Sequence, residues 1–184
     1  TKRLDKIFNF FELEENKDTV ILSFAHMFPL DELIAADHVK SNFDSSSRVL
    51  EDRLGVALEP IEVFEAGLIR TVDYLQKKGI ETIIAIDTPE LEFMPETCLS
   101  KRNSCEFNRA AVLKRQRVHR DMLQQIKTRF DSVKIFDSLK VFCDDKSPKC
   151  SILKDGRSLY RDSHHLSLYG SVEYGKHFSS FMNE

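Results

Sequence analysis

Hydrophobic positions along the chain fall into two patterns, one typical of helices and one typical of buried strands. Apolar residues recur at steps of three and four over 2–15 and again over 61–75, and Gly79 stands where the second of these helices should end. Three short runs are apolar or β-branched almost throughout, which predicts strands inside a sheet: TVILSF, ETIIAI and SVKIFDS.

The remaining patterns complete an alternation of helices and strands. A long helix is expected over about 106–130 and a last one from near Leu168 towards Met182, while 29–55 contains shorter helical patterns. The long helix should turn five residues inward: Ala110, Val118, Met122, Ile126 and Phe130. Such alternation predicts an α/β three-layer sandwich with a mostly parallel sheet, and no repeat or linker divides 1–184, so we expect one domain.

Composition restricts the classes of protein to which the chain can belong. Hydrophobic residues make up 41% and charged residues 31%, a balance typical of a globular domain and not of a disordered segment. The net charge is −3, and the most basic stretch, LKRQRVHRD, is interpreted as the solvated face of a helix, so nucleic acid is not an expected partner. No apolar run approaches the ~20 residues of a membrane span.

Four cysteines lie in two equally spaced pairs, Cys98 and Cys105, then Cys143 and Cys150. Zinc sites usually leave about two to four residues between paired ligands, whereas six intervene here. Both segments are polar and rich in turn residues, so we expect surface loops with two local disulfides, although the spacing leaves three connectivities open. Disulfides indicate an oxidising compartment such as the periplasm or the extracellular space; four reduced thiols are the alternative.

A polar stretch near the end, SLYRDSHHLSLYGS, holds the most chemically suggestive residues. Asp162, His164 and His165 lie together there, just before the last predicted helix. In open parallel sheets, ligands bind outside the carboxyl ends of the strands. The segments SFAHMF and DTPELEF and the loop after KIFDS should lie at that edge, and the Asp-His loop can reach it too.

Several kinds of chemistry compete for this stretch. A metal site is disfavoured because adjacent histidines point in different directions and no Glu-x-x-His or His-x-x-x-His spacing accompanies them, so we expect neither metal nor cofactor. A cysteine nucleophile is disfavoured because all four thiols should be paired. Asp162 and His165 are three residues apart and can form a proton-transfer dyad in which the carboxylate orients the imidazole. The same spacing also fits an aspartate that caps a turn beside a surface histidine.

The final block resembles a motif of the SGNH hydrolase superfamily, whose catalytic Asp and His form Asp-x-x-His. More narrowly, it is similar to the C-terminal SGNH domain of membrane-bound acyltransferases of the acyltransferase-three type, which O-acetylate bacterial surface polysaccharides. That subfamily typically reads Tyr-x-Asp-x-x-His-Leu-Ser followed by a glycine, and the matching residues here are Tyr160, Asp162, His165, Leu166, Ser167 and Gly170. The resemblance extends from about residue 19 to the end and includes both cysteine segments.

This resemblance implies a Ser-His-Asp acyl-enzyme mechanism. His165 would be the general base for a nucleophilic serine and then the acid for the leaving group, and Asp162 would orient it and stabilise its charge. His164 occupies a variable position of the motif and would be peripheral. In the superfamily, a glycine, an asparagine and the backbone N–H of the serine usually form the oxyanion hole.

The chain departs from the superfamily at the nucleophile. It contains no Gly-Asp-Ser and no Gly-x-Asn-Asp, and Ser23 and His26 lie where the oxyanion-hole block would fall. Three explanations stay open: the chain begins after the serine block and lacks the first strand, the domain is a degenerate binding module, or Ser23 replaces the nucleophile. We expect the first, which fits the absence of an initiator Met, although a missing strand would expose a sheet edge.

The function implied is transfer of an acyl group, most simply acetyl, to sugar hydroxyls of a cell-surface polysaccharide or lipopolysaccharide. The expected partners are that glycan as acceptor and a membrane-embedded acyltransferase domain that delivers the acyl donor. The expected location is the periplasmic or extracellular face, with a tether to the inner membrane through an upstream domain. The alternatives are a carbohydrate or lipid esterase, which uses water in place of sugar, and a non-catalytic glycan-binding domain.

Overall fold

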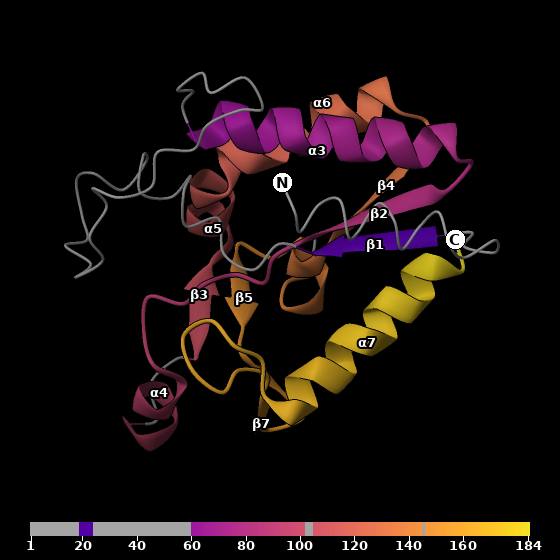
Figure 1. Ribbon diagram of the computed structural model, residues 1–184. Coiled ribbons are helices and arrows are strands. Elements are labelled where there is room, and N and C mark those ends of the chain that lie inside the picture. Colours follow the sequence, from indigo (N-terminus) through magenta and orange to yellow (C-terminus); the bar gives the residue numbers. More distant parts are fainter. Residues whose placement is uncertain (1–18, 24–59, 102–104, 145) are drawn as a thin grey trace.

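The computed structural model describes four stretches of the chain (Figure 1): 19–23, 60–101, 105–144 and 146–184. The helix expected over 2–15, the short helical patterns within 29–55 and His26 lie outside these stretches.

Helices and strands alternate as the hydrophobic pattern predicts. In chain order the elements are β1 (Thr19–Ser23), α3 (Pro60–Lys77), β2 (Glu81–Ile86), α4 (Pro95–Lys101), β3 (Glu106–Asn108), α5 (Arg109–Arg115), α6 (Arg117–Arg129), β4 (Val133–Asp137), the 3₁₀ helix η2 (Ser138–Val141), β5 (Lys149–Ser151), β6 (Leu153–Lys154), β7 (Arg157–Ser158) and α7 (Leu168–Met182). Gly79 follows α3 with a φ of +73°, the left-handed conformation in which glycine commonly ends a helix.

A parallel sheet with the order β1-β2-β4 forms the middle layer. Figure 1 shows α3 and α6 on one face of this sheet and α7 on the other. β2 is the central strand and is buried on both faces, which explains why its sequence, ETIIAI, is almost continuously apolar. The predicted α/β sandwich with a parallel sheet is therefore confirmed.

Two hydrophobic cores fill the spaces between the layers, because successive strand residues point to opposite faces. Ile84 of β2 belongs to the core under α3 and α6, and its neighbour Ile83 belongs to the core on the α7 side. In the latter, the ring centroid of Phe136 lies 5.2, 5.0 and 5.4 Å from those of Tyr174, Phe178 and Phe181. This aromatic packing fixes α7, and with it the Asp-His loop that precedes it, against the sheet.

The prediction of one long helix over about 106–130 is wrong. The first three residues form β3, which pairs with β5, and the helical part is divided into α5 and α6. The side chain of Asn108 accepts a hydrogen bond from the backbone N–H of Ala111, so α5 starts only after this cap. Of the residues expected to face inward, Met122, Ile126 and Phe130 are buried, whereas Ala110 is exposed.

Both predicted disulfides are present, and they link nearest neighbours, Cys98 to Cys105 and Cys143 to Cys150. The expectation of surface loops is wrong for the cysteines themselves, since all four are buried. The reason is the antiparallel pairing of β3 with β5, which lays the two cysteine segments side by side and covers them with core residues.

Reduction of the two disulfides should destabilise this part of the fold. Each bond closes a short loop, and loops of this length correspond to about 2–3 kcal/mol of unfolding free energy per bond. Urea unfolding with and without a reductant measures the difference. An unchanged midpoint after complete reduction, verified by thiol titration, would contradict the expectation.

His119 of α6 is a buried base in the core under α3. Its side chain is 3% exposed, its ring lies edge-on to Phe64, and neither ring nitrogen has a hydrogen-bond partner among the residues that the structure describes. Burial and the charge of Arg120 lower the pKa of His119 from 6.5 to about 4, against the opposite influence of Asp87. His119 is therefore neutral at neutral pH.

The burial of His119 should make the stability of the fold depend on pH. Between pH 6.5 and about 4 the unfolded chain binds a proton that the folded chain does not, so stability present above pH 6.5 is lost as the pH falls. We expect His119→Leu to remove about 2–3 kcal/mol of the stability difference between pH 7 and pH 4. Chemical unfolding of both proteins at several pH values tests this, and parallel curves would refute it.

Candidate active site

The Asp-His loop, residues 159–167, connects β7 to α7 and is closed by its own backbone. Tyr160 and Leu166 form an antiparallel bridge, and the N–H of Arg161 donates to the carbonyl of His165 at 2.8 Å. The loop is thus a compact turn that brings Asp162 and His165 together.

Two hydrogen bonds attach this loop to the segment that follows β2. The Tyr160 hydroxyl donates to the carbonyl of Pro89 at 2.6 Å, and the N–H of Leu91 donates to the carbonyl of Ser163 at 2.7 Å. Pro89 and Leu91 belong to the DTPELEF segment, which was expected at the carboxyl end of the sheet. The prediction that the Asp-His loop reaches this edge is therefore confirmed for β2.

Asp162 and His165 are in direct contact. Nδ1 of His165 lies 2.8 Å from Oδ2 and 3.0 Å from Oδ1 of the carboxylate. The backbone N–H groups of His164 and His165 also donate to Oδ1, at 3.0 and 2.8 Å. The aspartate therefore caps the turn and orients the imidazole at the same time, so the two interpretations that the sequence left open both describe it.

The electrostatics of the pair favour an ionised Asp162. Partial burial acts to raise its pKa, but the hydrogen bonds from the backbone of His164 and His165 and from the His165 ring outweigh this effect and hold the pKa well below its usual range. An ionised carboxylate accepts Nδ1–H and leaves Nε2 of His165 with a lone pair for proton transfer. The His165 side chain is 52% exposed.

His164 lies closer to the pair than the sequence suggested. Its Nδ1 is 3.1 Å from Oγ of Ser163 and 3.6 Å from Oδ1 of Asp162, and the two histidine rings are 4.0 Å apart. Adjacent histidines therefore do not diverge here, which corrects the reason for disfavouring a metal. One ligand atom from each of Asp162, His164 and His165 lies within 4.8 Å of the others. In this arrangement the carboxylate of Asp162 already accepts hydrogen bonds from the His165 ring and from two backbone N–H groups.

The Leu-Ser-x-x-Gly part of the motif joins the loop to α7. Ser167 is the N-cap of α7: its Oγ accepts from the N–H of Gly170 at 2.9 Å and donates to the carbonyl of Ser158 at 2.6 Å. A side-chain carbon on Gly170 would lie 1.9 Å from the carbonyl oxygen of Leu159, so only glycine fits there. These residues have a structural role, which is to seat the helix against the strand that leads into the loop.

A partly buried ion pair and a neighbouring hydrogen bond support the same edge of the sheet from α6 and η2. Arg120 contacts both carboxylate oxygens of Asp137, at 2.7 and 2.8 Å, and Ser138 donates to the carbonyl of Asp87 at 2.7 Å. The interpretation of LKRQRVHRD as a solvated face is therefore wrong for His119 and Arg120. The spacing of His119 relative to Met122, Leu123 and Ile126 was the signal for its burial.

Ser23 is the exposed last residue of β1 and pairs in register with Ala85 of β2. It therefore lies at the carboxyl edge of the sheet, as expected from its place in the TVILSF run. The sequence-predicted site residues that the structure brings into contact are Asp162 and His165, with His164 beside them.

Tyr160 should position the loop without taking part in chemistry. Its hydroxyl is buried, and burial raises its pKa strongly, so it stays protonated and donates to Pro89. Tyr160→Phe would leave that carbonyl unpaired, at a cost of about 1–3 kcal/mol of stability. We expect thermal unfolding to show this loss, and an unchanged melting temperature in the variant would contradict it.

Comparison with protein families identifies the chain. The family described as SGNH domain (fused to AT3 domains) matches residues 1–180. Searches of curated proteins and of solved structures gave no significant match. No described helix has the length and apolar character that crossing a bilayer requires. The family match covers nearly the whole chain and agrees with the parallel sheet and the motif around the dyad, so this chain belongs to the SGNH domains that are fused to AT3 acyltransferase domains.

Proposed function

We propose that this domain transfers an acetyl group to a hydroxyl of a cell-surface glycan through a covalent acyl-serine intermediate. The contact of His165 with Asp162 is the observation that carries the proposal. Membership of the family supports acyl-transfer or esterase chemistry in general. It also supports a membrane acyltransferase domain, fused to this one, as its partner. The two disulfides fit a domain outside the cytoplasm.

Each half-reaction moves one proton through His165. The serine Oγ attacks the acyl carbonyl while Nε2 of His165 takes its proton, and that proton then leaves with the donor's leaving group. In the second half, the sugar hydroxyl attacks the acyl-serine and gives its proton to Nε2, which returns it to the serine. Asp162 stabilises the imidazolium that exists between these transfers.

The nucleophile is proposed to come from a strand outside residues 1–184. Within the described part of the chain, β1 pairs on one side, with β2, and Ile21 of β1 is 50% exposed. A further parallel strand beside β1 would complete the sheet and cover Ile21. A serine at its carboxyl end would stand at the edge to which the Asp-His loop is attached.

Acetylation of the native glycan tests the proposal and separates it from its alternatives. Cells producing the full-length protein or its His165→Ala variant are compared by NMR of the purified surface polysaccharide. We expect the variant to lose the acetyl esters that the native protein installs. More acetyl ester in the variant would favour an esterase, and equal acetylation in both would favour a non-catalytic binding domain.

A further inference from the structure

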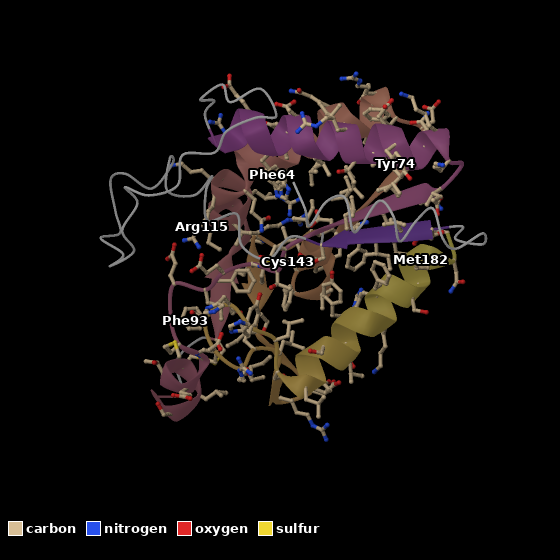
Figure 2. All side chains as sticks on the ribbon, viewed as in Figure 1. Phe64, Tyr74, Phe93, Arg115, Cys143 and Met182 are labelled. Carbon is tan, nitrogen blue, oxygen red and sulfur yellow. A yellow bond between two sulfur atoms is a disulfide. The ribbon has the colours of Figure 1, made fainter. Side chains whose placement is uncertain are left out.

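A cavity of about 200 Å³ lies between the segment that follows β2 and the unit formed by β3 and α5. Its walls combine aromatic rings with charged groups: Glu90, Glu92, Phe93, Glu106, Phe107 and Arg115. Figure 2 shows Phe93 and Arg115 at the same end of the molecule, far from Met182 at the end of α7. The volume is below that of a site for a drug-sized ligand and suits one small ring.

One wall of the cavity is linked to the Asp-His loop through a single residue. Glu90 and Glu92, which line it, flank Leu91, and the N–H of Leu91 donates to the carbonyl of Ser163. Ser163 is the residue between Asp162 and His164. The segment that forms one wall of the cavity is therefore hydrogen-bonded to the loop that carries the proposed general base.

The lining matches the chemistry of a sugar better than that of a hydrocarbon chain. Phe93 and Phe107 are half-buried and offer aromatic surface for the C–H face of a pyranose ring. The guanidinium of Arg115 contacts the carboxylates of Glu90 and Glu92, at 3.8 and 3.4 Å. Alternating donors and acceptors of this kind suit hydroxyl groups, whereas an acyl chain would remove water from charges without replacing its hydrogen bonds.

The charge of the lining selects among sugars. Three carboxylates, those of Glu90, Glu92 and Glu106, meet two positive charges, because Arg115 contacts Glu90 and Glu92 and the ammonium of Lys149 lies 2.9 Å from Glu106. The excess of negative charge disfavours a uronic acid, a sialic acid or a phosphorylated sugar.

We infer that this cavity is the acceptor subsite and that it binds one neutral sugar ring of the glycan beside the dyad. The inference rests on the proposed function, because it names the acceptor of that reaction. Phe93 supplies the stacking surface, and the Arg115–Glu92 pair supplies hydrogen bonds to ring hydroxyls.

Saturation-transfer NMR on the full-length protein tests the inference without any chemistry. The probes are methyl glycosides of glucose, galactose, mannose and N-acetylglucosamine, with methyl glucuronide as the charged counterpart. We expect at least one neutral glycoside to bind and the glucuronide to bind at least about tenfold more weakly. Phe93→Ala and Arg115→Gln should weaken the neutral glycoside by about tenfold, the change that follows from a loss of about 1.4 kcal/mol.

Two further variants control for folding and for charge. Glu92→Gln alters a side chain that is 76% exposed, so it should fold normally and still weaken binding. Arg117→Gln removes an exposed arginine two positions from Arg115, on α6, and should leave binding unchanged. The inference is overturned if no neutral glycoside binds or if the glucuronide binds as tightly as the neutral glycosides. It is also overturned if binding of the neutral glycoside survives Arg115→Gln and Glu92→Gln.

The two proposals can fail separately in these experiments. If the protein binds the glycoside in this cavity but never acetylates glycan, the proposed subsite is supported and the proposed function is wrong. If the protein acetylates glycan but shows no cavity-dependent binding, the proposed function is supported and the proposed subsite is wrong.

Discussion

Replacement of His165 with asparagine is expected to reduce the rate of acyl transfer by about a thousandfold or more. Asparagine cannot accept and return the proton of an attacking hydroxyl, so both half-reactions lose their base. The exposed position of His165 means that the fold should tolerate the change. Initial rates with an activated acetyl ester as donor measure the loss.

The neighbouring histidine is the matched control for that result. His164→Asn changes the same side chain one position earlier, where the ring contacts Ser163 and lies 3.6 Å from Asp162. Its rate should stay within a few-fold of the native rate. Equal losses in both variants would mean that the two histidines act as a unit, for example on a shared cation, and would contradict the dyad.

Asp162→Asn tests the other half of the pair. The amide oxygen can still accept from the backbone N–H groups of His164 and His165, so the turn should persist. The negative charge that stabilises the imidazolium is lost, and the same class of rate loss is expected. Retained activity in this variant would show that the aspartate only caps the turn.

Gly170→Ala is expected to destabilise the fold strongly at the start of α7. The added carbon would lie 1.9 Å from the carbonyl oxygen of Leu159, and the atom it meets is backbone, which cannot rotate away. Either α7 or the start of the Asp-His loop must shift, at a cost of the order of 3 kcal/mol. Because that shift also moves Asp162 and His165, activity should fall at temperatures where the variant is still folded.

Gly175 provides a control in the same helix. A side-chain carbon there meets nothing within 4 Å, so Gly175→Ala should instead stabilise α7 by about 0.5–1 kcal/mol. Thermal unfolding of both variants checks the pair of predictions. Similar melting temperatures for the two would contradict the close packing of α7 against Leu159.

The layers of the fold could be predicted from sequence because their signals are local. β2 is apolar on both faces since it is the central strand, and α7 begins at a residue that follows a capping serine. In the same way, Asp162 and His165 could be paired from sequence because three residues in a tight turn bring them together.

Other features escaped prediction because distant segments determine them. β3 is a strand only because β5, about forty residues later, pairs with it, and this pairing also buries the cysteines. Arg120 reads as a surface charge until Asp137 of β4 is placed opposite it. The cavity beside Leu91 is likewise assembled from β3, α5 and a loop that carry no common motif.

The central claim is that His165 and Asp162 activate a serine for covalent acyl transfer, and active-site labelling tests it most directly. The full-length protein is exposed briefly to a fluorophosphonate ester, and the modified residue is located by intact-mass analysis and peptide mapping. We predict labelling of one serine, outside residues 1–184, that disappears in the His165→Ala variant. Labelling of Ser23 would show that the nucleophile is the last residue of β1 instead. The absence of any labelling in a folded protein would contradict the covalent mechanism.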